Sequence, residues 1–197
     1  ESRGLGDVYK RQKLFLHFEA IMGKSRIYVN GKLLAEHFGG HLPVSVDMTN
    51  ALNWGEDNVI AVWADNSDDP TYAPGKPQDV LDYTYFGGIY RDCWLIAHNL
   101  VFITDPNYEN ETAGGGLFVA FDNVSEQSAD ILLKAHIRND NARNFAGNIA
   151  YSLVDRDGKE VASSDMKLSI RKGTAISRNG KMKVEQPCLL YTSDAAD

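Results

Sequence analysis

The stretch RIYVNGKLLA, at residues 26–35, predicts a β-hairpin and, with it, an all-β fold. β-branched and aromatic residues flank Asn30-Gly31, and this dipeptide readily supplies the positive φ that both positions of a two-residue turn require. Two continuous apolar runs of strand length follow at Val59–Ala64 and Asp92–Ala97. Because such runs are typical of strands covered on both faces, we expect Trp63 and Trp94 to be largely buried.

The second half of the chain also contains strand-like runs, which follow one another at short spacing. Strand-like runs recur at 101–103, 117–121, 131–137 and 149–154, and Asp155–Lys159 forms a turn signal before the next run. No segment keeps a 3.6-residue apolar period, so little helix is expected. Regular short strands separated by turns favour an immunoglobulin-like sandwich, with a domain boundary near residue 99 and no flexible linker there.

Composition excludes several classes of function. The chain has 197 residues, 20 Lys and Arg against 27 Asp and Glu, and a net charge of −7. This acidic balance, without a basic cluster, argues against nucleic acid or an anionic membrane as a partner. No run approaches the roughly 18 apolar residues that cross a bilayer. Cys93 and Cys188 allow one disulfide at most.

The sequences of both chain ends suggest that they do not come from the natural gene. Residues 7–12 (DVYKRQ) and 188–193 (CLLYTS) can be encoded by inverted DNA repeats, in the manner of transposon adaptors from sequencing libraries. We therefore expect residues 1–12 and 188–197 to be adaptor-derived, to pack against nothing, and to leave 13–187 as the native segment. Cys93 is then the one native cysteine. With the native start missing, cytoplasmic and periplasmic locations both stay open.

Three features that could indicate a metal site, a phosphate-binding loop or a nucleophile are better explained as structural elements. His37 and His41 have a spacing that suits a metal on a helix, but Gly39-Gly40 between them disfavours a helix. Gly114–Gly116 follows no phosphate-binding pattern and is most simply a loop. Cys93 lies within an apolar strand, where a buried structural thiol is expected rather than a nucleophile.

A set of motifs is far more specific in its order and spacing. The segments are Tyr28–Lys32, His37–Pro43, Asp47–Thr49, Gly55–Val62, Asp65-Asn66 and Tyr85–Asp92. Over residues 14–97 they resemble the N-terminal sugar-binding domain of the family-2 glycoside hydrolases, the group of β-galactosidases, β-glucuronidases and β-mannosidases. Gly-Gly-Ile-Tyr-Arg-Asp, at residues 87–92, is the most specific element of this resemblance.

The resemblance implies a jelly-roll (galactose-binding-like) β-sandwich over residues 13–99 and an immunoglobulin-like β-sandwich over 100–187. It implies that the chain is the non-catalytic N-terminal part of a retaining exo-β-glycosidase, and the segment from Asp82 to Asp92 resembles the β-galactosidase version. The family's two catalytic glutamates lie in a TIM barrel that would follow Pro187, so no catalytic residue and no hydrolysis are expected here. A carbohydrate-binding module or surface adhesin without hydrolase activity is the alternative.

The resemblance also implies two sugar-contacting residues, Asp82 and Asn30. An ionised carboxylate accepts two hydroxyl hydrogen bonds, and an amide both donates and accepts. The alternative is that Asn30 serves only its turn and Asp82 only solvent or a cap. In the family the counterpart of Asp82 can also bind sodium, and sodium or magnesium is expected, if at all, only in the full-length enzyme. We interpret Arg91 and Asp92 as structural residues that satisfy buried polar groups.

The expected partners follow from the same resemblance. They are a β-galactoside or related glycan, the enzyme's own barrel domain, and a second copy of the enzyme, since family-2 enzymes are often oligomers.

Overall fold

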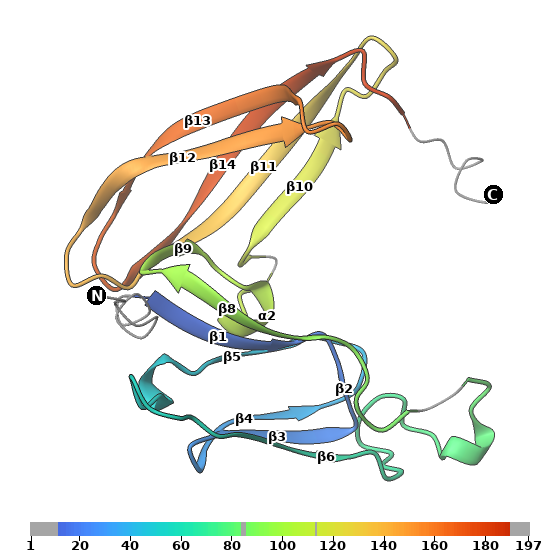
Figure 1. Ribbon diagram of the computed structural model, residues 1–197. Helices are drawn as coiled ribbons and strands as arrows, with labels where there is room; N and C mark the ends of the chain where they lie inside the picture. Colours follow the sequence, from blue (N-terminus) through green and yellow to red (C-terminus); the bar gives the residue numbers. More distant parts are fainter. Residues whose placement is uncertain (1–11, 84–85, 113, 190–197) are drawn as a thin grey trace. The chain divides into compact units, whose positions relative to one another are not determined.

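The computed structural model describes residues 12–83, 86–112 and 114–189, and its chain divides into two compact units (Figure 1). The first unit extends to Leu100 and includes Asn107–Asn110, whereas the second contains Val101–Pro106 and the chain from Glu111 onward. Strands dominate both units. The described helices are short, namely η1 (Thr49–Ala51), η2 (Gln78–Val80) and α2 (Pro106–Glu109). The all-β class expected from the sequence is confirmed.

The first unit is a sandwich of two antiparallel three-stranded sheets (Figure 1). One sheet has the order β5 (Val44–Asp47), β1 (Gln12–Phe18), β8 (Cys93–Asn99), and the other has β4 (Lys32–Phe38), β3 (Lys24–Val29), β6 (Ile60–Asp65). A short ribbon pairs β2 (Ile21–Met22) with β7 (Gly88–Ile89). The expected hairpin forms at Asn30-Gly31, with φ values of 50° and 78°.

Alternation along β1 and β3 builds the core of this unit. Leu14, Leu16 and Phe18 on β1 pack in one cluster with Ile27 and Val29 on β3. Period-2 alternation places such residues on a single face of each sheet, and the hydrophobic effect brings the two faces together.

The expected burial of Trp63 and Trp94 is wrong, since the two side chains are 45% and 51% exposed. Both lie on strands at the end of a sheet order, β6 and β8. Their cross-strand partners are Arg26 and His17, so both indoles point to the outer faces. A continuous apolar run does not reveal which strand ends a sheet, and this caused the error.

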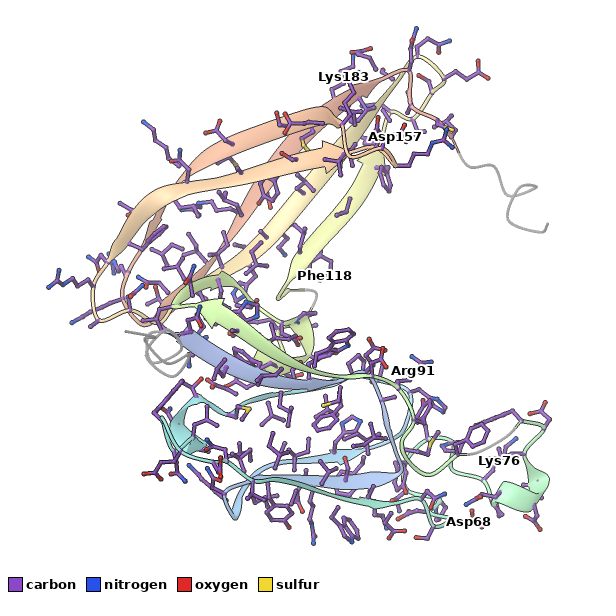
Figure 2. All side chains as sticks on the ribbon, in the orientation of Figure 1. Asp68, Lys76, Arg91, Phe118, Asp157 and Lys183 are labelled. Atoms are coloured by element: carbon purple, nitrogen blue, oxygen red, sulfur yellow. The ribbon has the colours of Figure 1, made fainter. Side chains whose placement is uncertain are left out.

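The expected burial of Cys93 on β8 is also wrong. Cys93 is exposed instead of buried, because β8 is an edge strand. Arg91 and Asp92 are exposed as well (Figure 2, Arg91), and the guanidinium of Arg91 lies 5.6 Å from the centre of the Tyr90 ring. Their expected role toward buried polar groups stays a prediction. The backbone has a structural role at this point, because the carbonyl of Asp92 accepts a hydrogen bond from the Glu19 amide at 3.0 Å.

The second unit is built from two layers of antiparallel strands. One layer contains β9 (Val101–Ile103), β10 (Leu117–Asp122), β11 (Ser128–Asn139) and β14 (Thr174–Glu185), and the other contains β12 (Phe145–Val154) and β13 (Glu160–Ile170). The turn expected at Asp155–Lys159 closes through a hydrogen bond from the Asp155 amide to the Lys159 carbonyl at 2.9 Å. The assignment to the immunoglobulin-like topology stays a prediction.

Most of the two chain ends lies outside the described residues, namely 1–11 and 190–197. Gln12 begins β1 and pairs with Asn99, so the expectation that residues 1–12 pack against nothing is wrong for this residue. Cys188 and Leu189 line an apolar cavity of the second unit. Among the described residues, no helix is long and apolar enough to cross a membrane.

Candidate functional site

The candidate site lies where β3 begins and β4 and β6 end. Lys24 pairs with Phe38 on one side and with Asp65 on the other, so the ends of these three strands coincide. The connections that leave β4 and β6, residues 39–43 and 66–87, therefore start from the same end of the first unit. Asp68 and Lys76 mark the longer connection in Figure 2.

Glycines allow these connections to pack closely against the strands. Gly23 has a φ of +87°, and a Cβ on it would lie 2.0 Å from the Asp65 carbonyl oxygen. A Cβ on Gly40 would lie 2.2 Å from the sulfur of Met22. Backbone and side chain thus occupy the space that a larger residue would need, which explains why glycine occupies these two positions.

Hydrogen bonds join segments that are distant in the sequence. The Tyr90 hydroxyl donates to the Gly40 carbonyl, and the Gly39 amide donates to the Gly23 carbonyl at 3.1 Å. The side chain of Asn66 packs directly on Gly87. The His-Phe-Gly-Gly-His, Asp-Asn and Gly-Gly-Ile-Tyr motifs are therefore parts of a single assembly.

The long connection is ordered by its own carboxylates. Asp69 accepts hydrogen bonds from the amide and hydroxyl of Thr71 at 2.8 and 2.5 Å, and it pairs with Lys24 at 2.5 Å. Lys24 and then Thr71 lower the pKa of Asp69 to about 2. The side-chain amide of Gln78 donates to the Asn66 carbonyl at 2.9 Å, and the backbone amide of Gln78 donates to the Asp68 carboxylate at 3.1 Å. Loops held in this way present side chains in a defined geometry.

Asp82 lies on this connection with its side chain exposed, next to Tyr83. The rings of Tyr83 and His41 meet edge to face with centroids 6.5 Å apart, which links the two connections beside Asp82. The group of exposed apolar side chains around this end comprises Phe38, Leu42, Val80, Tyr83, Phe86 and Ile89. An exposed carboxylate beside exposed aromatic rings can accept hydroxyl hydrogen bonds while the rings cover the apolar face of a sugar.

The structure does not bring Asn30 to Asp82. Asn30 follows the end of β3, roughly 20 Å along the strand from Lys24, whereas the connection that carries Asp82 starts at the Lys24 end. Its side-chain nitrogen donates to the Ala51 carbonyl at 2.8 Å and to Asn58 at 2.7 Å, and its oxygen accepts from the Val59 amide at 2.9 Å. These contacts support the alternative that Asn30 serves its turn. The assignment of Asn30 and Asp82 to sugar binding itself stays a prediction.

Comparison with known proteins identifies the fold. Residues 6–99 match the sequence model of the glycosyl hydrolases family 2, sugar binding domain. The chain belongs to glycosyl hydrolase family 2. The match begins at residue 6, upstream of the native start expected at residue 13.

Relatives in family 2 carry two activities in their names. A β-glucuronidase of Formosa agariphila is 33% identical over 188 residues, which are 93% of this chain and 19% of that protein. A β-galactosidase of Thermoanaerobacter pseudethanolicus is 30% identical over 156 residues, or 79% and 19% of the two chains. Among solved structures, a family-2 β-glucuronidase superimposes with a TM-score of 0.85 and 32% identity over 95% of this chain and 20% of that one. The chain thus spans about a fifth of these relatives.

The residues of this family-2 domain offer no evident cation site. Among the described residues, no group of three or more His, Cys, Asp and Glu side chains is arranged to hold a metal ion. His37 is half-buried on β4, where burial lowers its pKa, whereas His41 contacts Tyr83 in the connection. A single exposed carboxylate at Asp82 does not by itself fit a sodium site.

Sequence reasoning overlooked two features of this family-2 site. Tyr90 was part of the most specific motif, yet its role as a tie to Gly40 was not predicted. The contact between His41 and Tyr83 was also missed, because the two residues are joined only by the tertiary fold. The available signal was that His41 and Tyr90 each lie close to a Gly-Gly pair, Gly39-Gly40 and Gly87-Gly88.

Proposed function

We propose that the chain is the non-catalytic N-terminal part of a retaining exo-β-glycosidase and that Asp82 positions the terminal sugar of a β-galactoside. The observation that carries the proposal is the exposed carboxylate of Asp82 next to Tyr83, whose ring joins this connection to the shorter one through His41. The hydroxyls of a terminal sugar offer donors to such a carboxylate, and the adjacent ring offers an apolar face.

Charge favours a neutral sugar over a glucuronide at this site. The long connection and the end of β6 carry five carboxylates, on Asp65, Asp68, Asp69, Asp79 and Asp82. Two lysines, Lys24 and Lys76, are the basic residues that oppose them in this part of the site. A second carboxylate at about 4 Å from Asp82 would cost roughly 1–4 kcal/mol, depending on how wet the site is. The names of the relatives divide between both sugars, so this charge argument decides our choice of substrate.

The bond cleavage itself would belong to another part of the enzyme. A retaining glycosidase needs two carboxyl groups about 5 Å apart, one as nucleophile and one as acid and base. In our proposal a barrel domain supplies both, and this chain supplies orientation. Contacts to remote hydroxyls that strengthen as the ring distorts raise kcat as well as binding. The barrel is thus a proposed partner of this chain, and a second copy of the enzyme is another.

The proposal is tested on the chain itself by NMR titration with methyl β-D-galactoside. We expect saturable shifts of order millimolar affinity, confined to the residues around Asp82, Tyr83 and His41. Methyl β-D-glucuronide should shift the same signals more weakly. Asp82→Ala should abolish the shifts, whereas Asn30→Ala should keep them. Shifts that survive Asp82→Ala would place the sugar elsewhere and refute the assignment.

A carbohydrate-binding module without hydrolase activity is the second candidate, favoured by the exposed aromatic rings at the site. Two experiments separate the candidates. The isolated chain should hydrolyse no chromogenic galactoside in either case. Sequencing the natural gene beyond Pro187 should reveal a barrel with two glutamates if the enzyme proposal is right, and a stop or repeated domains if the module is right.

A further inference from the structure

The outer face of the sheet β4-β3-β6 carries an aromatic and charged row that the Asp82 site does not use. Arg26 on β3 pairs with Trp63 on β6 and with Glu36 on β4, so these three residues lie side by side across the sheet. Ile27, the next residue on β3, is fully buried in the core. Because successive side chains of a strand point to opposite faces, the row lies on the face turned away from the core.

Trp63 is held in a fixed setting although its side chain is 45% exposed. The guanidinium carbon of Arg26 lies 5.2 Å from the centre of the Trp63 ring, a distance typical of cation–π contact. Glu36 fixes the guanidinium in turn, since Arg26 donates from Nε to the Glu36 carboxylate at 2.6 Å. An exposed indole that is already ordered loses little conformational entropy when a ligand binds to it.

The two cationic side chains of β3 on this face are both paired within the protein. Arg26 pairs with Glu36, and Lys24, two residues along β3, pairs with Asp69 at 2.5 Å. The face therefore presents an aromatic ring flanked by donors and acceptors, and Asp65, the register partner of Lys24, adds one further negative charge. Such a surface suits an uncharged ligand with many hydroxyl groups, whereas an anionic ligand would have to break these ion pairs to gain a partner.

We propose that this face is a second carbohydrate-binding surface, at which a neutral pyranose ring stacks on Trp63 while its hydroxyls bond to Arg26 and Glu36. The indole supplies a large rigid apolar contact, and the two charged groups supply donors and acceptors beside it. The surface would take internal units of a neutral oligosaccharide, because an open sheet face has no wall that demands a chain end. It does not depend on Asp82 or on the activity of the whole enzyme.

The test uses the indole N–H signals of this chain in NMR titrations with β-1,4-galactotetraose and cellotetraose. Trp54, Trp63 and Trp94 give three such signals. We expect the Trp63 signal to shift saturably with at least one of these probes below about 20 mM. Tetragalacturonate, the anionic probe, should have a smaller effect. Trp63→Ala should weaken binding by about tenfold or more, as for other central aromatic anchors.

Trp94→Ala is the matched control, because Trp94 is 51% exposed on the other sheet and should leave the affinity unchanged. Asp82→Ala should also leave it unchanged, which separates this proposal from that of the galactoside site. Thermal unfolding of each variant verifies that the fold persists. No response of Trp63 to any neutral probe, or equal loss in Trp63→Ala and Trp94→Ala, refutes the proposal. Self-association of the chain that depends on Trp63 would refute it too, since the face would then be a protein interface.

Discussion

The hydroxyl of Tyr90 donates a hydrogen bond to the carbonyl of Gly40, and the two residues are separated by 50 positions in the sequence. Gly40 lies against Met22, and Tyr90 follows β7, whose partner strand β2 contains Met22. This bond therefore holds the short connection after β4 against the segment that leads into β8. The orientation of His41 and Tyr83 beside Asp82 depends on that closure.

Tyr90→Phe should remove the tie and keep the ring. We expect a loss of about 0.5–1.5 kcal/mol in the free energy of unfolding, measured by urea denaturation, because one partly buried hydrogen bond is lost. The NMR signals of His41 and Tyr83 should broaden or shift. Tyr83→Phe is the control, and its effect should stay within about 0.5 kcal/mol because that side chain is exposed.

Gly23→Ala and Gly31→Ala should differ sharply although both residues have positive φ, +87° and +78°. At Gly31 no atom lies within 4 Å of the added Cβ, so only backbone strain of about 1–2 kcal/mol applies. At Gly23 the Cβ would meet the Asp65 carbonyl, and the displacement of β6 should add roughly 1–3 kcal/mol. Equal thermal stabilities of the two variants would contradict this geometry.

Lys24→Ala should raise the pKa of Asp69 from about 2 toward its usual value of 3.8, since Lys24 is the largest cause of the shift. The Asp69 carboxyl carbon, followed by NMR between acid and neutral pH, measures the change. The hydrogen bonds from Thr71 remain, so the recovery should be incomplete. Lys76→Ala should leave the titration of Asp69 where it was.

Stability should fall at low pH partly through Asp47, a half-buried carboxyl on β5. Burial alone would raise its pKa, but hydrogen bonds from Lys13, at 2.6 Å, and from Thr49 lower it below the usual 3.8. The unfolded chain then binds more protons at this position, so the stabilisation is complete above pH ~4 and is lost as pH falls through the folded pKa.

The measurement for Asp47 is the thermal unfolding midpoint as a function of pH. Asp47→Asn should lower the midpoint at neutral pH and flatten its decline below pH ~4, because the titrating group is gone. A decline as steep as that of the natural chain would show that other carboxyls carry the acid sensitivity.

Asp82→Ala in the full-length enzyme should lower kcat/KM by about 10- to 150-fold, since a hydrogen bond to a charged group contributes roughly 1.5–3 kcal/mol. Thermal stability should change little, because the side chain is exposed. Asn30→Ala is the control, and we expect it to have the opposite pattern of effects. It should lower stability through the lost contacts to Ala51, Asn58 and Val59 and leave kcat/KM near normal. A kcat/KM unaffected by Asp82→Ala would remove Asp82 from the sugar site.

Local chemistry explains most of what could be predicted about the fold. The turn at Asn30-Gly31 follows from the φ values that these two residues tolerate, and the turn at Asp155–Lys159 is equally local. Exposure was less predictable. Trp63 and Trp94 lie in runs as apolar as those of a buried strand, but whether a strand ends a sheet depends on which distant segments pair with it.

The sequence by itself determined the all-β class, the hairpin turn and membership in glycosyl hydrolase family 2, because turn conformation, strand propensity and motif order are properties of neighbouring residues. The tertiary structure alone decided that the connection carrying Asp82 starts at the end of β3 opposite to Asn30, that Tyr90 reaches Gly40, and that Trp63 stacks beside Arg26 on an open face. These relationships arise from long-range strand pairing, in which a one-residue change of register turns every side chain to the other face.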